Sequence, residues 1–246
     1  MELLELTLPT PAENLALDDA LLQSAEQGTG PGNVLRLWES DRTFVVVGRG
    51  SKVAEEVDFN FCNAHDIEVL RRISGGATVV TGPGCLMYAV VLSTDDYPEA
   101  SGIDQSHAYV LDRIADSISQ LGQPVKRAGT SDLVLPTSDD PNEWRKISGN
   151  SMRKARRHFL YHGTILYNMD LQLVSNCLGT PPRMPDYRQR RSHEGFVAKL
   201  DASREALVSA IKDAWPLKGD MTDWPKSLVE ELVATKYSLA SWHERH

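Results

Sequence analysis

The chain has 246 residues, a formal net charge of −8 and 41% hydrophobic residues, and these values are typical of a globular protein. The acidic balance argues against general nucleic-acid binding, and no apolar run approaches the roughly 20 residues that span a bilayer. The N-terminus lacks the basic segment of a secretory signal, so we expect a cytoplasmic protein that does not enter membranes.

The first part of the chain predicts one long helix followed by short strands. Leucines at near-helical spacing and an early proline predict a helix over residues 9–26. Runs of β-branched and aromatic residues between turn formers predict strands over 34–38, 44–47 and 67–70, with a helix over 52–65. A Gly/Pro turn at 81–84 precedes an apolar strand at 86–92, so residues 76–92 predict a hairpin.

The second part predicts further strands and then mainly helices. Apolar residues at 110, 111, 114, 118 and 121 predict an amphipathic helix over 107–121. Strands are expected over 133–135, 146–148 and 160–167, with a turn over 137–142, and helices over 170–178, 202–215 and 226–236. Because short turns join consecutive strands, the sequence favours an α/β fold with a mixed, largely antiparallel sheet flanked by helices.

The three cysteines indicate no metal or disulfide framework. Cys62, Cys85 and Cys177 are widely spaced, odd in number and form no Cys-x-x-Cys pair. We therefore expect reduced thiols and no protein metal site.

Residues 71–80 read Arg-Arg-Ile-Ser-Gly-Gly-Ala-Thr-Val-Val and join two guanidinium groups to a glycine turn and a strand. Gly75 and Gly76 let the backbone approach a ligand closely. Arg72 offers a planar fork that suits a phosphate or a carboxylate. Taken alone, this segment fits a plain hairpin turn as well as it fits an anion site.

A second cluster supports the functional interpretation. Lys-Ile-Ser-Gly-Asn at 146–150 precedes His-Gly-Thr at 162–164, which lies inside an apolar run. Two further motifs are Asn-Leu-Ala-Leu-Asp at 14–18 and the strand 44–49, which ends in Gly-Arg. The order of all these motifs, together with the turn at 71–80, resembles the lipoate–protein ligase and octanoyltransferase family. The resemblance implies the fold shared with biotin ligases and with the class II aminoacyl-tRNA synthetase catalytic domain. It also implies a single catalytic domain over 1–246, without the C-terminal accessory domain of two-domain ligases.

The resemblance also implies roles for individual residues. Lys146 is the expected catalytic residue, because a fixed ammonium stabilises the charge that develops when ATP and a carboxylic acid form an acyl-adenylate. His162 is assigned to substrate binding, since a lone histidine in a strand is more often a hydrogen-bonded core residue than an acid or a base. ATP, with Mg²⁺ as its counter-ion, and lipoate or octanoate are expected to bind at Arg72, Ser74, Gly75, Gly76, Ala77, Thr78, Val79, Val80, Lys146, Ser148, Gly149, His162, Gly163 and Thr164.

The chain departs from the family pattern at two places near the glycine turn. Ala77 stands where the family usually has a third glycine, and it adds a methyl group where the nucleotide would approach. Residues 80–85 replace a His-Asp-x-Gly-Asn motif. Both departures weaken the case for full adenylation activity.

Three functions remain open at this point. Transferases of the family use a cysteine just before the lysine strand, but residues 129–133 read Gly-Thr-Ser-Asp-Leu, which disfavours a thioester mechanism. The leading hypothesis is a lipoate–protein ligase-like enzyme that activates lipoate or octanoate with ATP and transfers it to a lysine of a lipoyl carrier domain. The carrier would be a glycine cleavage H protein or a 2-oxoacid dehydrogenase E2, and a separate accessory subunit would complete the enzyme. The alternatives are an amidotransferase that moves the acyl group between carriers without ATP, and a non-catalytic acyl binder.

Basic residues gather in two stretches in spite of the acidic balance. They form either solvated loops or a positive rim that docks an acidic carrier around 153–157 and 188–191. The residues are Arg145, Lys146, Arg153, Lys154, Arg156 and Arg157, then Arg183, Arg188, Arg190 and Arg191.

Overall fold

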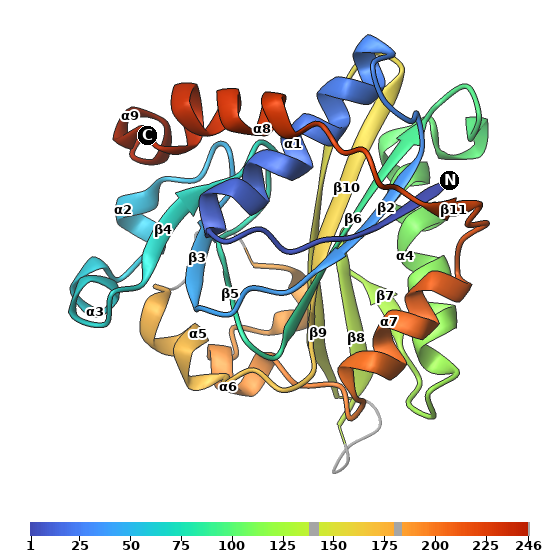
Figure 1. Cartoon of the computed structure of the whole chain (residues 1–246). Coiled ribbons are helices and arrows are strands. Elements are labelled where there is room, and N and C mark those ends of the chain that lie inside the picture. Colours follow the sequence, from blue (N-terminus) through green and yellow to red (C-terminus); the bar gives the residue numbers. More distant parts are fainter. Residues whose placement is uncertain (138–142, 180–183, 246) are drawn as a thin grey trace.

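The computed structural model describes residues 1–137, 143–179 and 184–245. Within them, the strands form a large sheet in the order β11-β1-β2-β6-β10-β9-β8-β7 and a small sheet in the order β4-β3-β5 (Figure 1). The large sheet consists of β1 (Glu2–Glu5), β2 (Val34–Trp38), β6 (Cys85–Ser93), β7 (Lys126–Ala128), β8 (Asp132–Pro136), β9 (Trp144–Lys154), β10 (His158–Leu166) and β11 (Gly219–Asp220). The small sheet consists of β3 (Phe44–Val47), β4 (Glu68–Arg71) and β5 (Val79–Thr81).

Helices flank both sheets, and most of them are short. Strands β2, β6, β10, β9, β8 and β7 pair antiparallel, while β1 pairs parallel with both of its neighbours. The α-helices are α1 (Pro11–Gln27), α2 (Val53–Glu56), α3 (Phe59–Ala64), α4 (Ile103–Ser119), α5 (Gln172–Cys177), α6 (His193–Phe196), α7 (Arg204–Asp213), α8 (Lys226–Leu232) and α9 (Ala240–His243). Two 3₁₀ turns and one π-helical turn lie at η1 (Pro98–Ala100), η2 (Asp186–Arg188) and η3 (Val233–Tyr237). This arrangement confirms the expected mixed, largely antiparallel sheet flanked by helices.

The large sheet separates two hydrophobic cores, and β6 contributes to both. Met87 and Ala89 pack on the side of α1, α8 and the small sheet, whereas Leu86, Tyr88 and Val90 pack on the side of α4 and α7. Successive side chains of a strand point to opposite faces, so a fully buried strand reads as a continuous apolar run. Helices α1 and α8 lie side by side over one face in Figure 1.

The N-terminal helix is confirmed, with bounds close to those expected. Thr10 caps it and exchanges hydrogen bonds with Glu13, and Gly28 ends it in the left-handed conformation. The helix expected over 107–121 begins earlier, at Ile103. The strand expected over 146–148 is the middle of the eleven-residue β9.

The hairpin expected over 76–92 is wrong. β5 pairs with β3 of the small sheet, whereas β6 pairs with β2 and β10 of the large sheet. Gly82 and Gly84, both at positive φ, turn the chain from one sheet to the other. A Gly/Pro turn between two apolar strands reads the same for both topologies, so local sequence did not distinguish them.

The helix expected over 52–65 is two helices, because Val57 is extended and forms an isolated bridge with Leu178. Asp58 then caps α3 by accepting a hydrogen bond from the Phe61 amide. The helix expected over 226–236 is α8 followed by the π-helical turn η3. Most of the turn expected over 137–142 lies outside the described residues.

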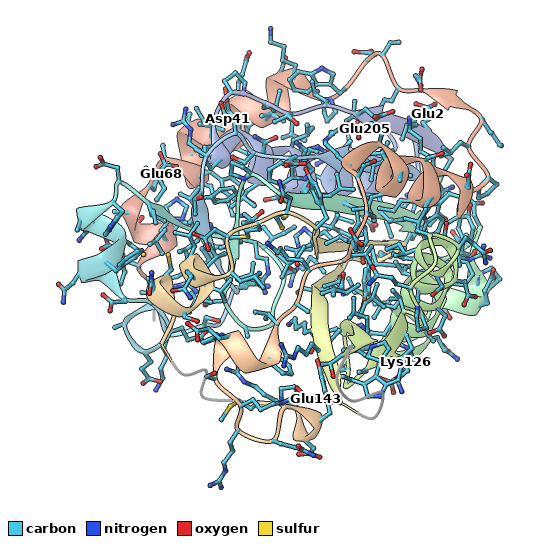
Figure 2. The ribbon with its side chains drawn as sticks, turned by 90° about the horizontal axis from the view of Figure 1, so that it is seen from below. Glu2, Asp41, Glu68, Lys126, Glu143 and Glu205 are labelled. Carbon is cyan, nitrogen blue, oxygen red and sulfur yellow. The ribbon has the colours of Figure 1, made fainter. Side chains whose placement is uncertain are left out.

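Charged residues are spread over the surface. The acidic residues labelled in Figure 2 come from separate parts of the chain: Glu2, Asp41, Glu68, Glu143 and Glu205. Of the described helices, none is long and apolar enough to cross a membrane.

Candidate active site

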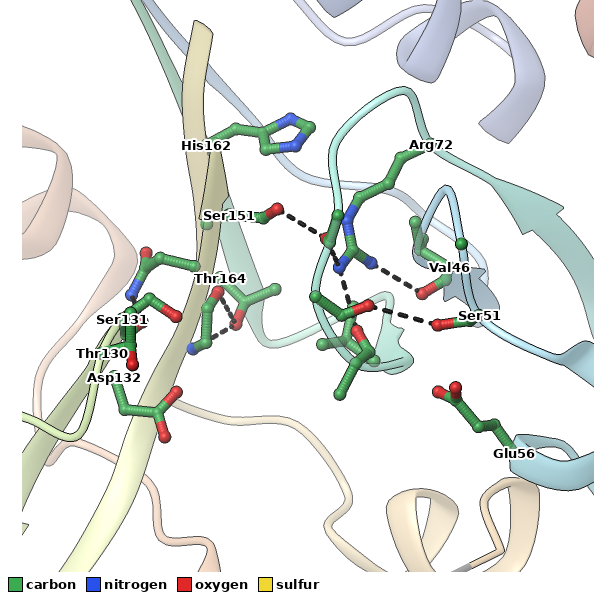
Figure 3. A pocket seen from close by; sticks show the side chains of 18 of the residues that line it. Val46, Ser51, Glu56, Arg72, Thr130, Ser131, Asp132, Ser151, His162 and Thr164 are labelled. Atoms are coloured by element: carbon green, nitrogen blue, oxygen red, sulfur yellow. Dashed lines mark hydrogen bonds between the residues drawn. The ribbon is translucent and has the colours of Figure 1, made fainter. Parts of the chain in front are cut away.

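A cavity of about 780 Å³ lies between the large and the small sheet. In Figure 3, His162, Ser151 and Thr164 come from the large sheet on one side, and Ser51 and Glu56 come from the opposite side. The turn after β4 lies between these two sides. The cavity therefore depends on residues that are far apart in the sequence.

Arg72 holds the shape of this turn from inside. Its Nε donates to Ser74 Oγ at 3.0 Å, and its Nη1 donates to the Val46 carbonyl at 3.0 Å. Its Nη2 donates to the carbonyls of Gly75 at 2.5 Å and Ala77 at 2.9 Å. These bonds use most of the five N–H groups of a guanidinium. Arg72 thus supports the turn while it also lines the cavity, and its expected contact with a phosphate stays a prediction.

The turn packs tightly against the end of β3. A Cβ atom at Gly48 would lie 1.9 Å from the carbonyl oxygen of Gly76, so no larger residue fits at Gly48 in this arrangement. Gly76 itself has a φ of 88°, in the left-handed region that favours glycine. Ser51 Oγ donates to the same carbonyl of Gly76 at 3.2 Å (Figure 3). Gly48, in the Gly-Arg pair that follows β3, therefore lets the 75–77 turn pack against the end of this strand.

His162 belongs to a buried chain of hydrogen bonds. Its Nδ1 lies 2.9 Å from Asp18 Oδ2, and its Nε2 lies 2.5 Å from Ser74 Oγ. Asp18 Oδ1 in turn accepts from Arg36 Nη1 at 2.6 Å. Since the Asp18 carboxylate is an acceptor, His162 donates from Nδ1 and leaves Nε2 to accept the Ser74 hydroxyl proton.

Ser74, His162 and Asp18 are hydrogen-bonded in the order of a Ser-His-Asp triad, but Ser74 is buried and supports the structure. Ser74 is 1% exposed, lies outside the residues that line the cavity, and receives the Arg72 Nε–H on the same oxygen. A substrate carbonyl cannot reach that oxygen in this conformation. His162 itself lines the cavity, and its role in substrate binding stays a prediction.

Lys146 faces the cavity from β9. Its Nζ lies 2.8 Å from Asp132 Oδ1, and Tyr187 Oη donates to Asp132 Oδ2 at 2.6 Å. Burial and the Asp132 charge raise the pKa of Tyr187 well above its usual value, so its hydroxyl stays a donor. An ammonium has three N–H donors, and the pairing with Asp132 leaves others for a substrate.

Two glycines make room for neighbouring side chains. A Cβ at Gly149 would lie 2.8 Å from Lys146 Nζ, so the lysine side chain crosses the strand directly over Gly149. A Cβ at Gly163 would lie 1.7 Å from Asn150 Oδ1. That amide in turn accepts from the Tyr88 hydroxyl. The space beside Gly163 is therefore filled by Asn150.

A smaller cavity of about 110 Å³ adjoins the first. The two share Lys146, Gly149 and Thr164 in their lining. The smaller one is mainly apolar, with Val79, Leu166, Val174, Leu178, Phe196 and Val197 among its lining residues. Its position behind Lys146 extends the site toward strand β5.

The comparison with known proteins decides the family. The model for the lipoyl protein ligase A/B catalytic domain matches residues 10–215. The chain belongs to this family. It is therefore an enzyme of the lipoyl protein ligase A/B family, as the motifs around Lys146 and the 72–77 turn led us to expect.

Individual relatives carry two kinds of name. The chain is 28% identical to the lipoate–protein ligase A subunit 1 of Thermoplasma acidophilum, over 97% of this chain and 95% of the relative. It is 30% identical to lipoate–protein ligase 1 of Staphylococcus aureus, over 95% of this chain and 70% of the relative. It is also 25% identical to the octanoyltransferase LipM of Brevibacillus brevis, over 96% of this chain and 95% of the relative.

Solved structures of the family share this fold. A bipartite lipoate protein ligase, studied with its E2 lipoyl domain from Thermoplasma acidophilum, superposes with a TM-score of 0.82 at 24% identity, covering 99% of this chain and 95% of that chain. A lipoate–protein ligase A bound with ATP superposes with a TM-score of 0.77 at 25% identity, covering 99% of this chain and 98% of that chain. These likenesses confirm the expected fold class.

The structure brings most of the expected site residues of this lipoyl ligase family member together. Arg72, Gly75, Gly76, Ala77, Val79, Lys146, Gly149, His162, Gly163 and Thr164 line the main cavity, and Thr78 and Val80 line the smaller one. Ser74 and Ser148 line neither, because Ser74 binds His162 and Ser148 binds Asn150. Both serines support the site from behind.

Sequence reasoning missed several residues that shape the site. Asp132 and Asn150 line the cavity and fix Lys146 and the strand around it. Glu56 accepts from the backbone amide of Thr78 at 3.0 Å and from its hydroxyl at 2.6 Å. Asn150 is the last residue of the 146–150 motif, and Asp132 lies in the segment 129–133 that precedes the lysine strand. Glu56 carried no such signal in the sequence.

The thiols lie away from the site. Cys62, Cys85 and Cys177 are buried and line neither cavity. Burial raises the pKa of Cys85 and that of Cys177 to about 12, which keeps both thiols protonated at neutral pH. Among the described residues there is also no group of three or more His, Cys, Asp or Glu side chains that could hold a metal ion.

The two basic stretches differ in the structure. Arg153, Arg156 and Arg157 are exposed. In the second stretch, Arg188 is 5% exposed and lies over the Phe196 ring, while Arg191 binds Glu143 at 2.9 Å. The expectation of a free positive rim is therefore wrong for Arg188 and Arg191, and Arg183 lies outside the described residues.

Proposed function

We propose that the protein activates lipoate or octanoate with ATP and transfers the acyl group from its adenylate to a lysine of a lipoyl carrier domain. The observation that carries this proposal is the position of Lys146. Its ammonium lies in the wall of a cavity that the 75–77 turn also lines, and among the described residues it forms an ion pair with Asp132 alone.

Lys146 is suited to the charge changes of adenylation. When a carboxylate attacks the α-phosphorus, negative charge grows on the phosphoryl oxygens and on the departing pyrophosphate. A cation that is already oriented stabilises that charge more than it stabilises the separate substrates. The carrier lysine then attacks the acyl carbon and AMP leaves. Mg²⁺ would enter as the counter-ion of ATP, held mainly by the phosphates.

We assign the acyl chain and the nucleotide to different parts of the site. Leu15, Val46 and Met87 line the main cavity beside His162 and offer an apolar wall for an acyl chain. β5 pairs only with β3 among the described strands, so one edge of its backbone faces away from the sheet. Val79 and Val80 line the smaller cavity, so we assign the purine base to the backbone amide and carbonyl groups of this strand.

The absence of a thiol at the site favours adenylation over a thioester route. Each of the three cysteines is buried outside the two cavities, and a thioester route needs an accessible thiolate. The ligase A relatives and the ATP-bound ligase structure support the same choice.

The test is pyrophosphate release on mixing the protein with ATP and lipoate, followed by transfer to an apo-lipoyl domain. We expect pyrophosphate with lipoate or octanoate, and none when either the acid or ATP is left out. Since the name "subunit 1" of one relative suggests an accessory subunit, both steps are measured with and without such a subunit. Absence of pyrophosphate under all these conditions would contradict the proposal.

The octanoyltransferase relatives keep a second function open. Under that function the protein moves an octanoyl or lipoyl group between carrier proteins without ATP. The near full-length match to LipM favours it, while the buried thiols oppose it. Acyl transfer from an acylated carrier in the absence of ATP would identify this activity.

A further inference from the structure

A second hollow, which we call the basic groove, borders the same turn as the cavity. Its volume is about 490 Å³, and no aspartate or glutamate is among its lining residues. The side chains that define it are Arg49, Arg153, Lys154 and Arg245, together with Ile103 and Met152. The groove is thus cationic in a protein whose net charge is −8.

The cations of the groove are not neutralised within the described part of the chain. Lys154 donates to the Ser101 carbonyl, and Arg245 lies 5.0 Å from the centre of the Trp242 ring. Neither contact involves a carboxylate. No ion pair joins Arg49 or Arg153 to an acidic side chain of the described residues. Such a surface attracts an acidic partner and speeds its association.

An exposed apolar residue lines the groove together with these cations. Ile103, the first residue of α4, is 60% exposed. Protein–protein interfaces combine an apolar centre with a charged rim, whereas a site for phosphate alone has no need of an exposed isoleucine. The composition therefore favours a folded acidic protein as the occupant.

The groove opens toward the active site through two glycines. Gly50 and Gly75 line both the basic groove and the main cavity. A Cβ at either position would meet no atom within 4 Å, so both face open space. A long side chain of a docked partner can pass between groove and cavity at this point.

We propose that the basic groove docks the acidic carrier domain and that its acceptor lysine enters the cavity past Gly50 and Gly75. This inference rests on the proposed function. The carrier domain would dock on this surface for the transfer of the acyl group to its lysine. The docking surface thus lies beside Arg49 and Arg153 and not beside residues 188–191.

The test is the double variant Arg153→Glu with Lys154→Glu, assayed with an acidic apo-lipoyl domain of a 2-oxoacid dehydrogenase E2. We expect the KM for this domain to rise by about tenfold or more at low ionic strength, while kcat at saturation and pyrophosphate release stay within about twofold of wild type. Raising the salt should increase the wild-type KM and change that of the variant much less, because the Debye length is only about 8 Å at physiological ionic strength.

Two further variants sharpen the test. Ile103→Asp should raise the same KM without affecting pyrophosphate release. Arg190→Glu is the matched control, because Arg190 is also exposed but belongs to the other basic stretch and lines neither the groove nor the cavity. We expect no more than a twofold effect from it.

Direct binding separates this inference from the proposed function. If wild type releases no pyrophosphate, the function fails, and the docking surface is then read from calorimetric titration of the same apo-domain into wild type and variants. The groove is refuted if Arg190→Glu weakens binding as much as the double variant, or if the double variant binds like wild type. It is also refuted if the double variant loses pyrophosphate release, since the groove would then serve the nucleotide.

Discussion

Lys146 and Asp132 form an ion pair in the wall of the main cavity. The ammonium of Lys146 on β9 lies 2.8 Å from the carboxylate of Asp132 on β8, and Tyr187 binds the other oxygen of that carboxylate. The pair fixes the direction of a long side chain whose rotamers are otherwise free. Because Gly149 has no side chain, the ammonium lies across the strand and reaches the cavity.

We expect Lys146→Ala to reduce acyl transfer by about 10²–10³-fold, the loss seen when one transition-state donor is removed. The fold should persist, since Lys146 lies in the cavity wall and not in a core. The measurement is single-turnover transfer from ATP and lipoate to a carrier domain. Lys199→Ala, which removes an exposed lysine, is the control and should retain wild-type turnover. Near wild-type turnover of Lys146→Ala would show that the catalytic assignment is wrong.

Replacing Asp18 should destabilise the protein strongly. Asp18→Asn leaves Arg36, which is 0% exposed, without a compensating charge, and breaking a buried pair in this way costs about 3–5 kcal/mol. Urea unfolding measures the loss. The control is Glu26→Gln, which weakens the more exposed pair with His158 and should cost much less. Equal losses in the two variants would mean that the Arg36–Asp18–His162 chain has no special structural role.

Gly163→Ala should destabilise the site by overpacking. The added methyl group would lie 1.7 Å from Asn150 Oδ1 and 3.0 Å from the Tyr88 ring, so Asn150 must move. Overpacking of this kind costs about 1–3 kcal/mol. Thermal or urea unfolding checks the prediction. Gly32→Ala is the matched control, because its methyl group would meet its nearest neighbour at an ordinary 3.4 Å.

The buried thiols should make the protein less stable as the pH becomes alkaline, and they should take no part in catalysis. Burial raises the pKa of Cys85 and Cys177 to about 12, so both remain protonated in the folded state where an unfolded thiol, with a pKa of about 8.5, ionises. The unfolded state therefore binds fewer protons, and stability is lost as the pH rises from about 9 toward 12.

Replacing Cys62, Cys85 and Cys177 together by Ala should reduce the alkaline loss between about pH 8 and 10, below the range where unfolded tyrosines ionise, and leave acyl transfer largely intact. Unfolding curves between pH 8 and about pH 11 provide the measurement. An acyl-thioester on any of the three residues, detected by mass, would instead support the transferase mechanism.

Acid should release the C-terminal segment through His243. His243 Nδ1 accepts from the Arg71 amide at 2.9 Å, and its Nε2 lies 2.8 Å from the Tyr237 carbonyl, so the folded state needs the neutral ring. Burial lowers the pKa of His243, and the unfolded state therefore binds more protons below about pH 6.5. The stability of this contact is present above that pH and is lost as the pH falls.

Hydrogen exchange at the Arg71 amide checks this prediction. Exchange should accelerate below about pH 6.5 relative to the intrinsic rate, and the amides of β6 should show no such change. His243→Asn offers an acceptor that does not titrate, so its protection should be independent of pH in this range. A wild-type profile that matches that of the variant would exclude His243 as the cause.

The sequence was sufficient to predict those helices, strands and motifs whose structure depends on their own residues and not on distant contacts. The pattern of leucines and the Thr10 cap specify α1, and alternation between two cores gives β6 its continuous apolar run. The motifs around residues 72–77, 146–150 and 162–164 identified the family, because glycines at close approaches and a fixed lysine are constraints that leave a mark in the residues themselves.

Other features depend on contacts between distant segments. No local pattern indicates that the N–H groups of Arg72 bind carbonyls of its own turn. None indicates that Ser74 binds a histidine 88 positions away, or that Glu56 of α2 accepts a hydrogen bond from the Thr78 amide. The partner of β5 was also open, since a glycine turn joins strands of one sheet or of two equally well. Long-range hydrogen bonds and packing select among such arrangements, because each buried donor and acceptor must find its partner somewhere in the folded chain.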